Sequence, residues 1–80
     1  MAGILAHLNA LIHFMAPSPN SLRRIKPNSF VGGYRYWGRE NREAPMKLVE
    51  GIRPGDLVNN FELKSFDHTS NQYFAMAAIL

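Results

Sequence analysis

Two stretches, NREAPMKLV (residues 41–49) and NNFELKSFD (residues 59–67), frame a short turn and organise the rest of the chain. In the second stretch apolar and charged residues alternate, in the order Phe61, Glu62, Leu63 and Lys64. Because successive side chains of a strand point to opposite faces, the alternation predicts a strand with its two charged residues on one face. The same pattern is also typical of a half-solvated strand with a surface charge pair.

Further strands are predicted around this one. Tyr34–Trp37 alternates aromatic and basic residues and indicates a short strand, Met46–Val49 a second, and Leu57–Phe66 the third and longest. The turn Arg53-Pro54-Gly55-Asp56 separates the last two, which favours a hairpin. We therefore expect the three strands to pair as an antiparallel sheet.

Helical spacing of apolar residues appears at both ends of the chain. A helix is predicted over residues 3–15, with the apolar stripe Ile4, Leu5, Leu8, Leu11, Ile12 and Met15. Pro17 and Pro19 end this helix, and a loop is expected after it. A last helix is predicted over about residues 72–80, after several candidate N-caps in residues 67–71. The order helix, loop, antiparallel strands, helix gives the fold class α+β.

Length limits what the chain can do alone. Eighty residues form at most one small domain with a marginal core, and there is no cysteine to staple it. The last helix stops at Leu80 inside an apolar pattern without a closing residue, which is typical of a truncated or partial sequence. We expect the isolated chain neither to fold cooperatively nor to catalyse a reaction.

Charge and hydropathy restrict the possible surroundings. The net charge of +3 and the isoelectric point near 9.7 permit attraction to anions. No apolar run approaches the roughly 20 residues that span a bilayer. No Lys or Arg precedes the apolar N-terminal part, as a secretory signal requires. The absence of cysteine fits a cytoplasmic protein, and His7 and His13 are spaced too far apart to share a metal on one helix.

Two motifs point to other classes of function. Gly33 and Gly38 have the spacing of a phosphate-binding loop, but Arg39-Glu40 stands where that loop requires Lys and Ser or Thr. A basic and aromatic set could instead form a nucleic-acid surface, although acidic residues interrupt it. This set comprises Arg23, Arg24, Lys26, Tyr34, Arg35, Tyr36, Trp37, Arg39 and Arg42. A non-catalytic nucleic-acid-binding or interaction fragment is therefore the alternative function.

Taken with PNSLRRI (residues 19–25), the two framing stretches resemble the C-terminal part of the glutamine synthetase catalytic domain. That family has an NS-aromatic-K-R-L segment, an NR segment and an R-I-E-V-R-F-P-D strand in this order. The likeness runs through essentially all 80 residues and is closest to plant nodulin/glutamine synthetase-like proteins. The resemblance implies one partial catalytic domain over residues 1–80.

The family reaction joins ammonia to the side-chain carboxylate of glutamate with ATP, through a γ-glutamyl phosphate. Position by position, the resemblance implies that Arg24 binds the substrate carboxylate, that Arg42 contacts phosphate and that Glu62 binds a metal. By the same resemblance, Lys47 stands where the family has a phosphate-binding arginine. Lys64 stands where the family has a second arginine that binds glutamate. Lysine keeps the charge at both positions but loses the bidentate fork of arginine.

Departures from the family pattern limit the expected activity. Six residues after Arg24, where the family has a catalytic flap glutamate in a G-Y-E-A-P context, this chain has Phe30. Glu43-Ala44-Pro45 follows the NR segment instead of preceding it, and Asn60 replaces a third phosphate arginine. No catalytic residue is therefore expected within the chain. ATP and Mg²⁺ or Mn²⁺ are implied for a complete, homo-oligomeric parent and not for the fragment, and neither a membrane nor a nucleic acid is expected as partner.

Overall fold

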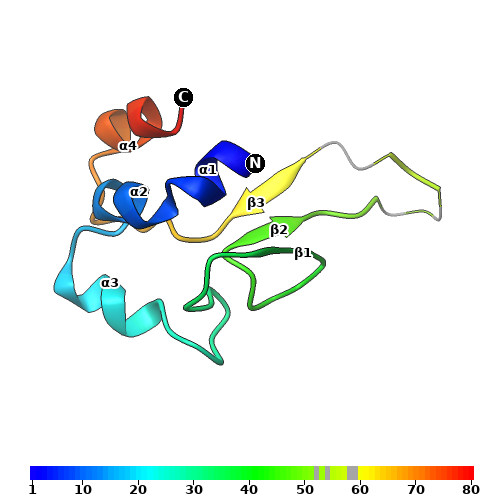
Figure 1. Ribbon diagram of the computed structural model, residues 1–80, viewed down its shortest axis with the longest axis horizontal. Helices are drawn as coiled ribbons and strands as arrows, with labels where there is room; N and C mark the ends of the chain where they lie inside the picture. The colour runs from blue at the N-terminus through cyan, green and yellow to red at the C-terminus, as the bar shows by residue number, and fades with distance from the viewer. Residues whose placement is uncertain (52, 54, 58–59) are drawn as a thin grey trace.

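The computed structural model describes residues 1–51, 53, 55–57 and 60–80 (Figure 1). Its elements are, in chain order, α1 (Ala2–Ala6), α2 (Leu8–Met15), α3 (Pro19–Arg24), β1 (Trp37–Arg39), β2 (Met46–Leu48), β3 (Phe61–Leu63) and α4 (Gln72–Ile79). The helices gather on one side and the three-stranded sheet on the other (Figure 1). This arrangement confirms the predicted α+β class.

The predicted N-terminal helix consists of two helices, α1 and α2, that meet at His7, where φ is −104° and ψ is 10°. Both helices are hydrogen-bonded to His7, because its N–H donates to the Gly3 carbonyl at 3.1 Å and its carbonyl accepts from the Leu11 N–H at 3.0 Å. The break gives α1 its own direction, and Leu5 lines a small pocket together with Trp37 and Leu48 of the sheet. The helical residues were thus predicted, but the break was not.

The prediction of a loop after the first helix is partly wrong, because α3 lies there. Ser18 is its N-cap, and the Ser18 hydroxyl accepts a hydrogen bond from the Asn20 N–H at 3.3 Å. Pro19 occupies the first helical turn, where the missing N–H of proline costs nothing because it would have no helical partner. Pro19 therefore begins a helix instead of excluding one.

The sheet has the order β1-β2-β3. Strands β2 and β3 pair antiparallel, with Met46 opposite Leu63, as the hairpin prediction required. Strand β1 pairs with β2 in parallel, so the prediction of a fully antiparallel sheet is wrong. Residues 40–45 return the chain to the end of the sheet at which β1 begins, so that β2 runs in the same direction. Glu40 lies in the left-handed region, at φ 45°. Alternation along a strand is the same in parallel and antiparallel pairs, so it could not reveal this connection.

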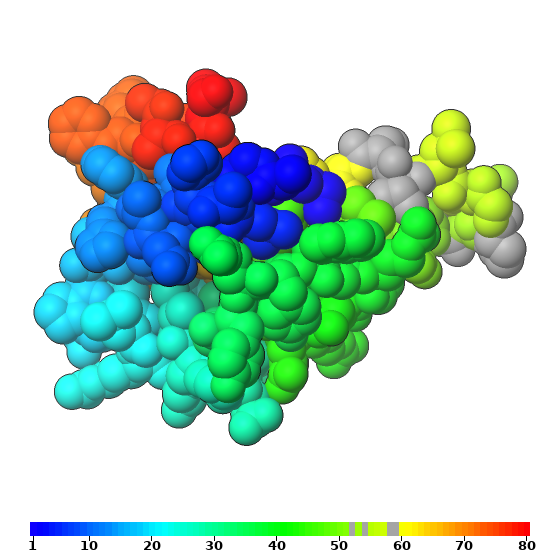
Figure 2. All heavy atoms as spheres, viewed as in Figure 1, coloured from blue at the N-terminus to red at the C-terminus, as the bar shows by residue number. Residues whose placement is uncertain are grey.

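The first predicted strand was misplaced along the chain. It was expected at Tyr34–Trp37 but β1 begins at Trp37, the last residue of that range. Arg35 instead donates from Nη1 to the Ala6 carbonyl at 3.2 Å. Figure 2 shows the green segment that contains these residues lying against the blue N-terminal helices. The segment before β1 therefore pairs with a helix end and not with a strand.

The other two strands lie within their predicted ranges but are shorter. The structure places β2 at Met46–Leu48, one residue shorter than expected. The third strand was expected over Leu57–Phe66 and is confined to Phe61–Leu63. Leu57 is outside any strand and 87% exposed, while Val58 and Asn59 lie outside the described residues. A strand ends where its partner ends, which its own alternation does not show.

The core lies between α2 and α4, which contact each other directly. Leu8, Leu11, Met15 and Ala75 are buried there, and partly buried neighbours pack around them: Ile4, Leu5, Ile12, Leu63, Phe66, Ala78 and Ile79. All six residues of the predicted N-terminal stripe thus belong to this core. The predicted last helix is confirmed as α4, capped by Asn71, whose side chain accepts from the Tyr73 and Phe74 N–H groups at 3.1 and 3.3 Å.

The two ends of the chain lie close together, since Met1 and Leu80 line the same cavity (Figure 1). Within the part of the chain that the structure describes, no helix has the length and apolarity needed to cross a membrane.

Candidate functional site

Strands β2 and β3 carry a charged cluster on one face of the sheet. Lys47 lies directly opposite Glu62, and the Lys47 Nζ is 3.1 Å from Glu62 Oε2. Glu40 approaches the same ammonium, with its Oε2 at 3.7 Å. The hydrogen bond that Lys47 donates to Glu62 is the main reason why the pKa of Lys47 is raised, and Glu40 shifts this pKa in the same direction. Lys47 therefore stays charged between two carboxylates.

Glu40 is fixed on this cluster by the backbone around it. Its N–H donates to the Leu48 carbonyl at 3.1 Å, and its Oε1 accepts from the Glu50 N–H at 2.8 Å. The bond from Glu50 is the main reason why the pKa of Glu40 is lowered, and the Lys47 charge adds to the effect. Both oxygens of this carboxylate are thus engaged, one by the backbone and one by Lys47.

Lys64 follows β3 directly and turns its ammonium toward backbone carbonyls. Its Nζ donates to the carbonyl oxygens of Phe30 at 3.0 Å, of Asn41 at 3.3 Å and, at shorter range, of Arg42. Burial lowers the pKa of Lys64, the neighbouring Glu62 opposes this shift, and the charges of Lys47 and Arg42 add to it. Glu62, Lys47 and Arg42 therefore lie close enough to Lys64 for their charges to act on its ammonium.

The two loops that supply these carbonyls lie against each other. A Cβ on Gly32 would stand 1.9 Å from the Glu43 carbonyl oxygen, and Gly32 has φ 71°. Only glycine permits both this approach and this conformation. The second loop is braced internally, because the Asn41 Oδ1 accepts from the Glu43 and Ala44 N–H groups at 2.9 and 3.2 Å.

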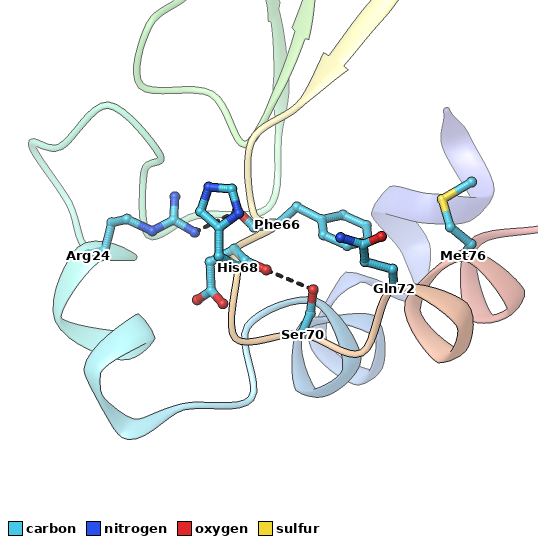
Figure 3. A pocket seen from close by; sticks show the side chains of 7 residues that line it. Arg24, Phe66, His68, Ser70, Gln72 and Met76 are labelled. Carbon is cyan, nitrogen blue, oxygen red and sulfur yellow. Dashed lines mark hydrogen bonds between the residues drawn. The ribbon is translucent and has the colours of Figure 1, made fainter.

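Arg24, at the end of α3, faces the chain just beyond β3. Its guanidinium donates to the Lys64 carbonyl at 3.1 Å and to the Phe66 carbonyl at 3.0 Å. It lines a cavity of about 670 Å³, in which His68 lies beside it and Met76 lies at the far side (Figure 3). A guanidinium has five N–H donors, so Arg24 retains donors after making these two bonds.

Asp67, on the wall of the same cavity, is held by hydroxyl and amide groups. The Ser21 hydroxyl donates to its Oδ2, and the Thr69 hydroxyl and N–H donate to its Oδ1, the latter at 2.9 Å. These hydrogen bonds lower the pKa of the Asp67 carboxyl group, and the bond from Ser21 has the largest effect. Asp67 thereby joins α3 to the segment before α4 and keeps its negative charge next to Arg24.

The residues predicted for the site are only partly brought together. Lys47 and Glu62 are in direct contact, and Lys64 contacts Arg42 through the Arg42 backbone carbonyl. Arg24 reaches Lys64 only at the Lys64 backbone, and its side chain lines the separate cavity. The predicted site is therefore a charged sheet face beside an arginine-lined cavity, joined at Lys64.

Phe61 and Leu63, the apolar residues of β3, were expected to pack against the helices. Leu63 packs against the core, whereas Phe61, which the alternation places on the same face, is 42% exposed and is not among the residues packed against that core.

A divalent metal does not fit the described residues alone. Across residues 1–51, 53, 55–57 and 60–80, no group of three or more His, Cys, Asp or Glu side chains could hold a metal ion. Glu40 and Glu62 both face the Lys47 ammonium. Since Mg²⁺ and Mn²⁺ prefer several oxygen ligands, any such ion needs ligands beyond these described residues.

Glu40, Ser21 and Asp67 were missed as members of these two regions. The sequence pattern predicts Asp67 only as a candidate helix cap, although an Asp two residues before a Thr is a common local hydrogen-bonding motif. Nothing local to the sequence marks Glu40, because its contact with Lys47 depends on the loop that makes β1 parallel to β2.

Comparison with known proteins adds a family likeness over the whole chain. The family described as glutamine synthetase, catalytic domain, matches residues 1–80. A gamma-glutamylpolyamine synthetase of Streptomyces coelicolor is 42% identical over all of this chain and 17% of its own length. A type-1 glutamine synthetase of Dictyostelium discoideum is 37% identical over all of this chain and 16% of its own. A gamma-glutamylanilide synthase of Acinetobacter is 30% identical over 95% of this chain and 15% of its own.

The chain thus spans less than a fifth of the length of these relatives. No solved structure matches it significantly.

Proposed function

Because this chain belongs to the glutamine synthetase catalytic-domain family, we propose that it is the C-terminal segment of a longer ATP-dependent ligase. The parent would join an amine to the side-chain carboxylate of glutamate. The observation that carries this proposal is the family match over residues 1–80, together with relatives of 37–42% identity over the full chain. In this proposal residues 1–80 are one partial catalytic domain.

The charged sheet face suits the phosphate side of such a reaction. A transferred phosphoryl group spreads negative charge over its oxygens and needs fixed cations beside it. We assign Arg42 and Lys47 to phosphate and ATP contacts by their positions in the family resemblance, and in support Lys47 lies on this face beside Glu62 and the charge of Arg42 acts on Lys64. Glu62 would contribute one metal ligand, with the others supplied by the rest of the parent.

Arg24 suits the carboxylate side of the reaction. It has unused guanidinium donors, and it lines a cavity that also contains apolar Phe66 and Met76. A carboxylate entering this cavity could accept two parallel hydrogen bonds from one arginine. We therefore assign Arg24 to the carboxylate of glutamate.

The amine is the least constrained substrate. Ammonia is the first candidate, since one relative is named a glutamine synthetase. Two other relatives are named for a polyamine and an anilide product. We propose ammonia, with a larger amine as the alternative within the same reaction.

Several finer features complete the proposal. We infer that the parent is a cytoplasmic homo-oligomer of the plant nodulin-like branch, and that it uses ATP with Mg²⁺ or Mn²⁺. The isolated 80-residue chain would be inactive, because its described residues complete no metal site.

The test is an activity assay of the full-length protein with ATP, Mg²⁺ and glutamate. Phosphate release is measured with ammonia, a polyamine or aniline as the amine, and one of the three is expected to sustain glutamate-dependent release. Absence of glutamate-dependent release with every amine contradicts the proposal.

A pair of neighbouring arginines tests the carboxylate assignment. Arg24→Met should raise the KM for glutamate by about tenfold or more, since charged hydrogen bonds to a carboxylate are lost. Arg23→Met is the control, because Arg23 is exposed and its side chain makes no hydrogen bond within the described residues. Equal KM values in the two variants would remove Arg24 from the site.

A further inference from the structure

The ammonium of Lys64 is already saturated with protein partners. A lysine ammonium has three N–H donors and no acceptor. The Lys64 Nζ donates to three carbonyl oxygens, those of Phe30, Asn41 and Arg42. Within the part of the chain described, no donor of this group is left for a ligand.

These three acceptors join parts of the chain that are far apart in sequence. Phe30 lies 34 residues before Lys64, and Asn41 and Arg42 lie 23 and 22 residues before it. The loop with Phe30 and the loop with Arg42 also touch at Gly32 and the Glu43 carbonyl. Lys64 thus connects the end of β3 to two loops that already abut.

Arg24 differs from Lys64 because its side chain has unused hydrogen-bond donors. The Arg24 guanidinium also donates to backbone carbonyls, but it uses two of five donors and borders an open cavity. Binding a carboxylate at Arg24 requires no bond to break. Binding one at Lys64 would first require one of its three bonds to carbonyl oxygens to break, because the ammonium has no further donor.

We propose that Lys64 is a positioning residue that holds the loop of Arg42 against the loop of Phe30, and that it does not bind substrate directly. This inference rests on the proposed function, in which Arg42 contacts phosphate. Lys64 acts on the reaction through the backbone of Arg42, so its loss should affect ATP more than glutamate.

The test uses Lys64→Met in the full-length protein, which keeps the apolar stem and removes all three donors. In the ligand-free protein, hydrogen exchange of residues 29–33 and 40–45 should become about tenfold faster or more, because the contact that closes these loops is lost. The KM for ATP should rise by about tenfold, since small displacements of a positioned group have large effects. The KM for glutamate should change less than about twofold. Unchanged loop exchange with a raised KM for glutamate would overturn the inference.

A second variant covers the case in which Lys64→Met fails to fold. Lys64→Arg keeps the positive charge, but a planar guanidinium cannot direct its donors to three converging carbonyls in the same way. It should still accelerate loop exchange and raise the KM for ATP. If Lys64 bound glutamate directly, Lys64→Arg would leave both loops unchanged and would improve or preserve the KM for glutamate, since arginine binds carboxylates through two bonds.

Two controls separate this inference from the proposed function. Lys26→Met removes an exposed lysine whose ammonium has no hydrogen bond among the described residues, and it should change none of the readouts. Arg42→Gln should raise the KM for ATP without altering loop exchange, because the Arg42 contact with Lys64 is made by the backbone. If Arg42→Gln leaves the KM for ATP unchanged, the role of Arg42 in the proposed function fails. The exchange measurement on Lys64→Met still decides whether Lys64 holds the loops.

Discussion

Lys47 and Glu62 are direct cross-strand partners of β2 and β3, and their side chains meet with Nζ 3.1 Å from Oε2. The two side chains are 21% and 51% exposed, so water screens the pair and its own contribution to stability is small. The proposed function gives Glu62 a second role, as one ligand of a divalent metal in the parent.

Glu62→Gln in the full-length protein should therefore weaken binding of Mg²⁺ or Mn²⁺ by about tenfold or more while leaving the fold nearly unchanged. Isothermal titration of the metal into both proteins measures the affinities. Glu50→Gln is the matched control, since Glu50 is exposed and contacts the cluster through its N–H alone. Identical metal affinities of the Glu62→Gln variant and the unsubstituted full-length protein would contradict the assignment of Glu62 as a metal ligand.

The hydroxyl of Ser21 should stabilise the protein in a pH-dependent way. Ser21 is buried and donates a hydrogen bond to the carboxylate of Asp67. This bond is the largest cause of the lowered pKa of Asp67. A carboxyl group with a lowered pKa in the folded state contributes stability that is present above its unfolded pKa and is lost as the pH falls through the folded value. Ser21→Ala should cost about 1–2 kcal/mol near neutral pH, and less as Asp67 becomes protonated.

Melting temperatures of the full-length protein between neutral pH and strongly acidic pH test this prediction. Ser70→Ala is the control, because the Ser70 hydroxyl donates to the backbone carbonyl of Asp67 and not to its carboxylate. The effect of Ser70→Ala should show no such dependence on the charge of Asp67. A constant difference between Ser21→Ala and the parent across the whole pH range would contradict the predicted linkage.

Gly32→Ala should destabilise the protein more than Gly55→Ala. Both glycines have a positive φ, 71° and 90°, so alanine is strained at either position. Only at Gly32 does the added Cβ also collide with backbone, at 1.9 Å from the Glu43 carbonyl oxygen, whereas Gly55 has open space around it among the described residues. Alanine at Gly55 should cost about 1 kcal/mol, and at Gly32 about 2 kcal/mol more, from chemical denaturation or thermal melting. Equal costs would mean that the two loops do not abut.

The isolated chain of 80 residues should lack a cooperative thermal transition. Its buried core is small, and large apolar side chains are exposed on α4 and in the loops, among them Phe30 at 74%, Tyr73 at 87%, Phe74 at 66% and Leu80 at 98%. A domain of this size that leaves so much apolar surface in water has little stability to lose. Circular dichroism during heating should show a broad change, and a hydrophobic dye should bind at room temperature. A sharp two-state melt would refute this prediction.

Much of the fold could be predicted from local pattern. The residues of α2 and α4 and the apolar stripe of the core follow from helical spacing, and the hairpin of β2 and β3 follows from alternation around a turn. The break at His7 and the start of α3 at Pro19 were missed. The capping serine before Pro19 was a usable signal for α3, whereas His7 has no breaker residue beside it.

The sequence by itself determined the apolar stripe of the N-terminal helical residues, that β2 and β3 form a hairpin, and that the chain is a glutamine synthetase-type segment. These properties depend on residue spacing within one element, or on motif order along the chain. Only the tertiary structure decided the parallel pairing of β1, the contact of Lys47 with Glu40, and the three carbonyls on Lys64. Each of these depends on how a loop directs its backbone, since side chains of the same type can reach different partners depending on that path.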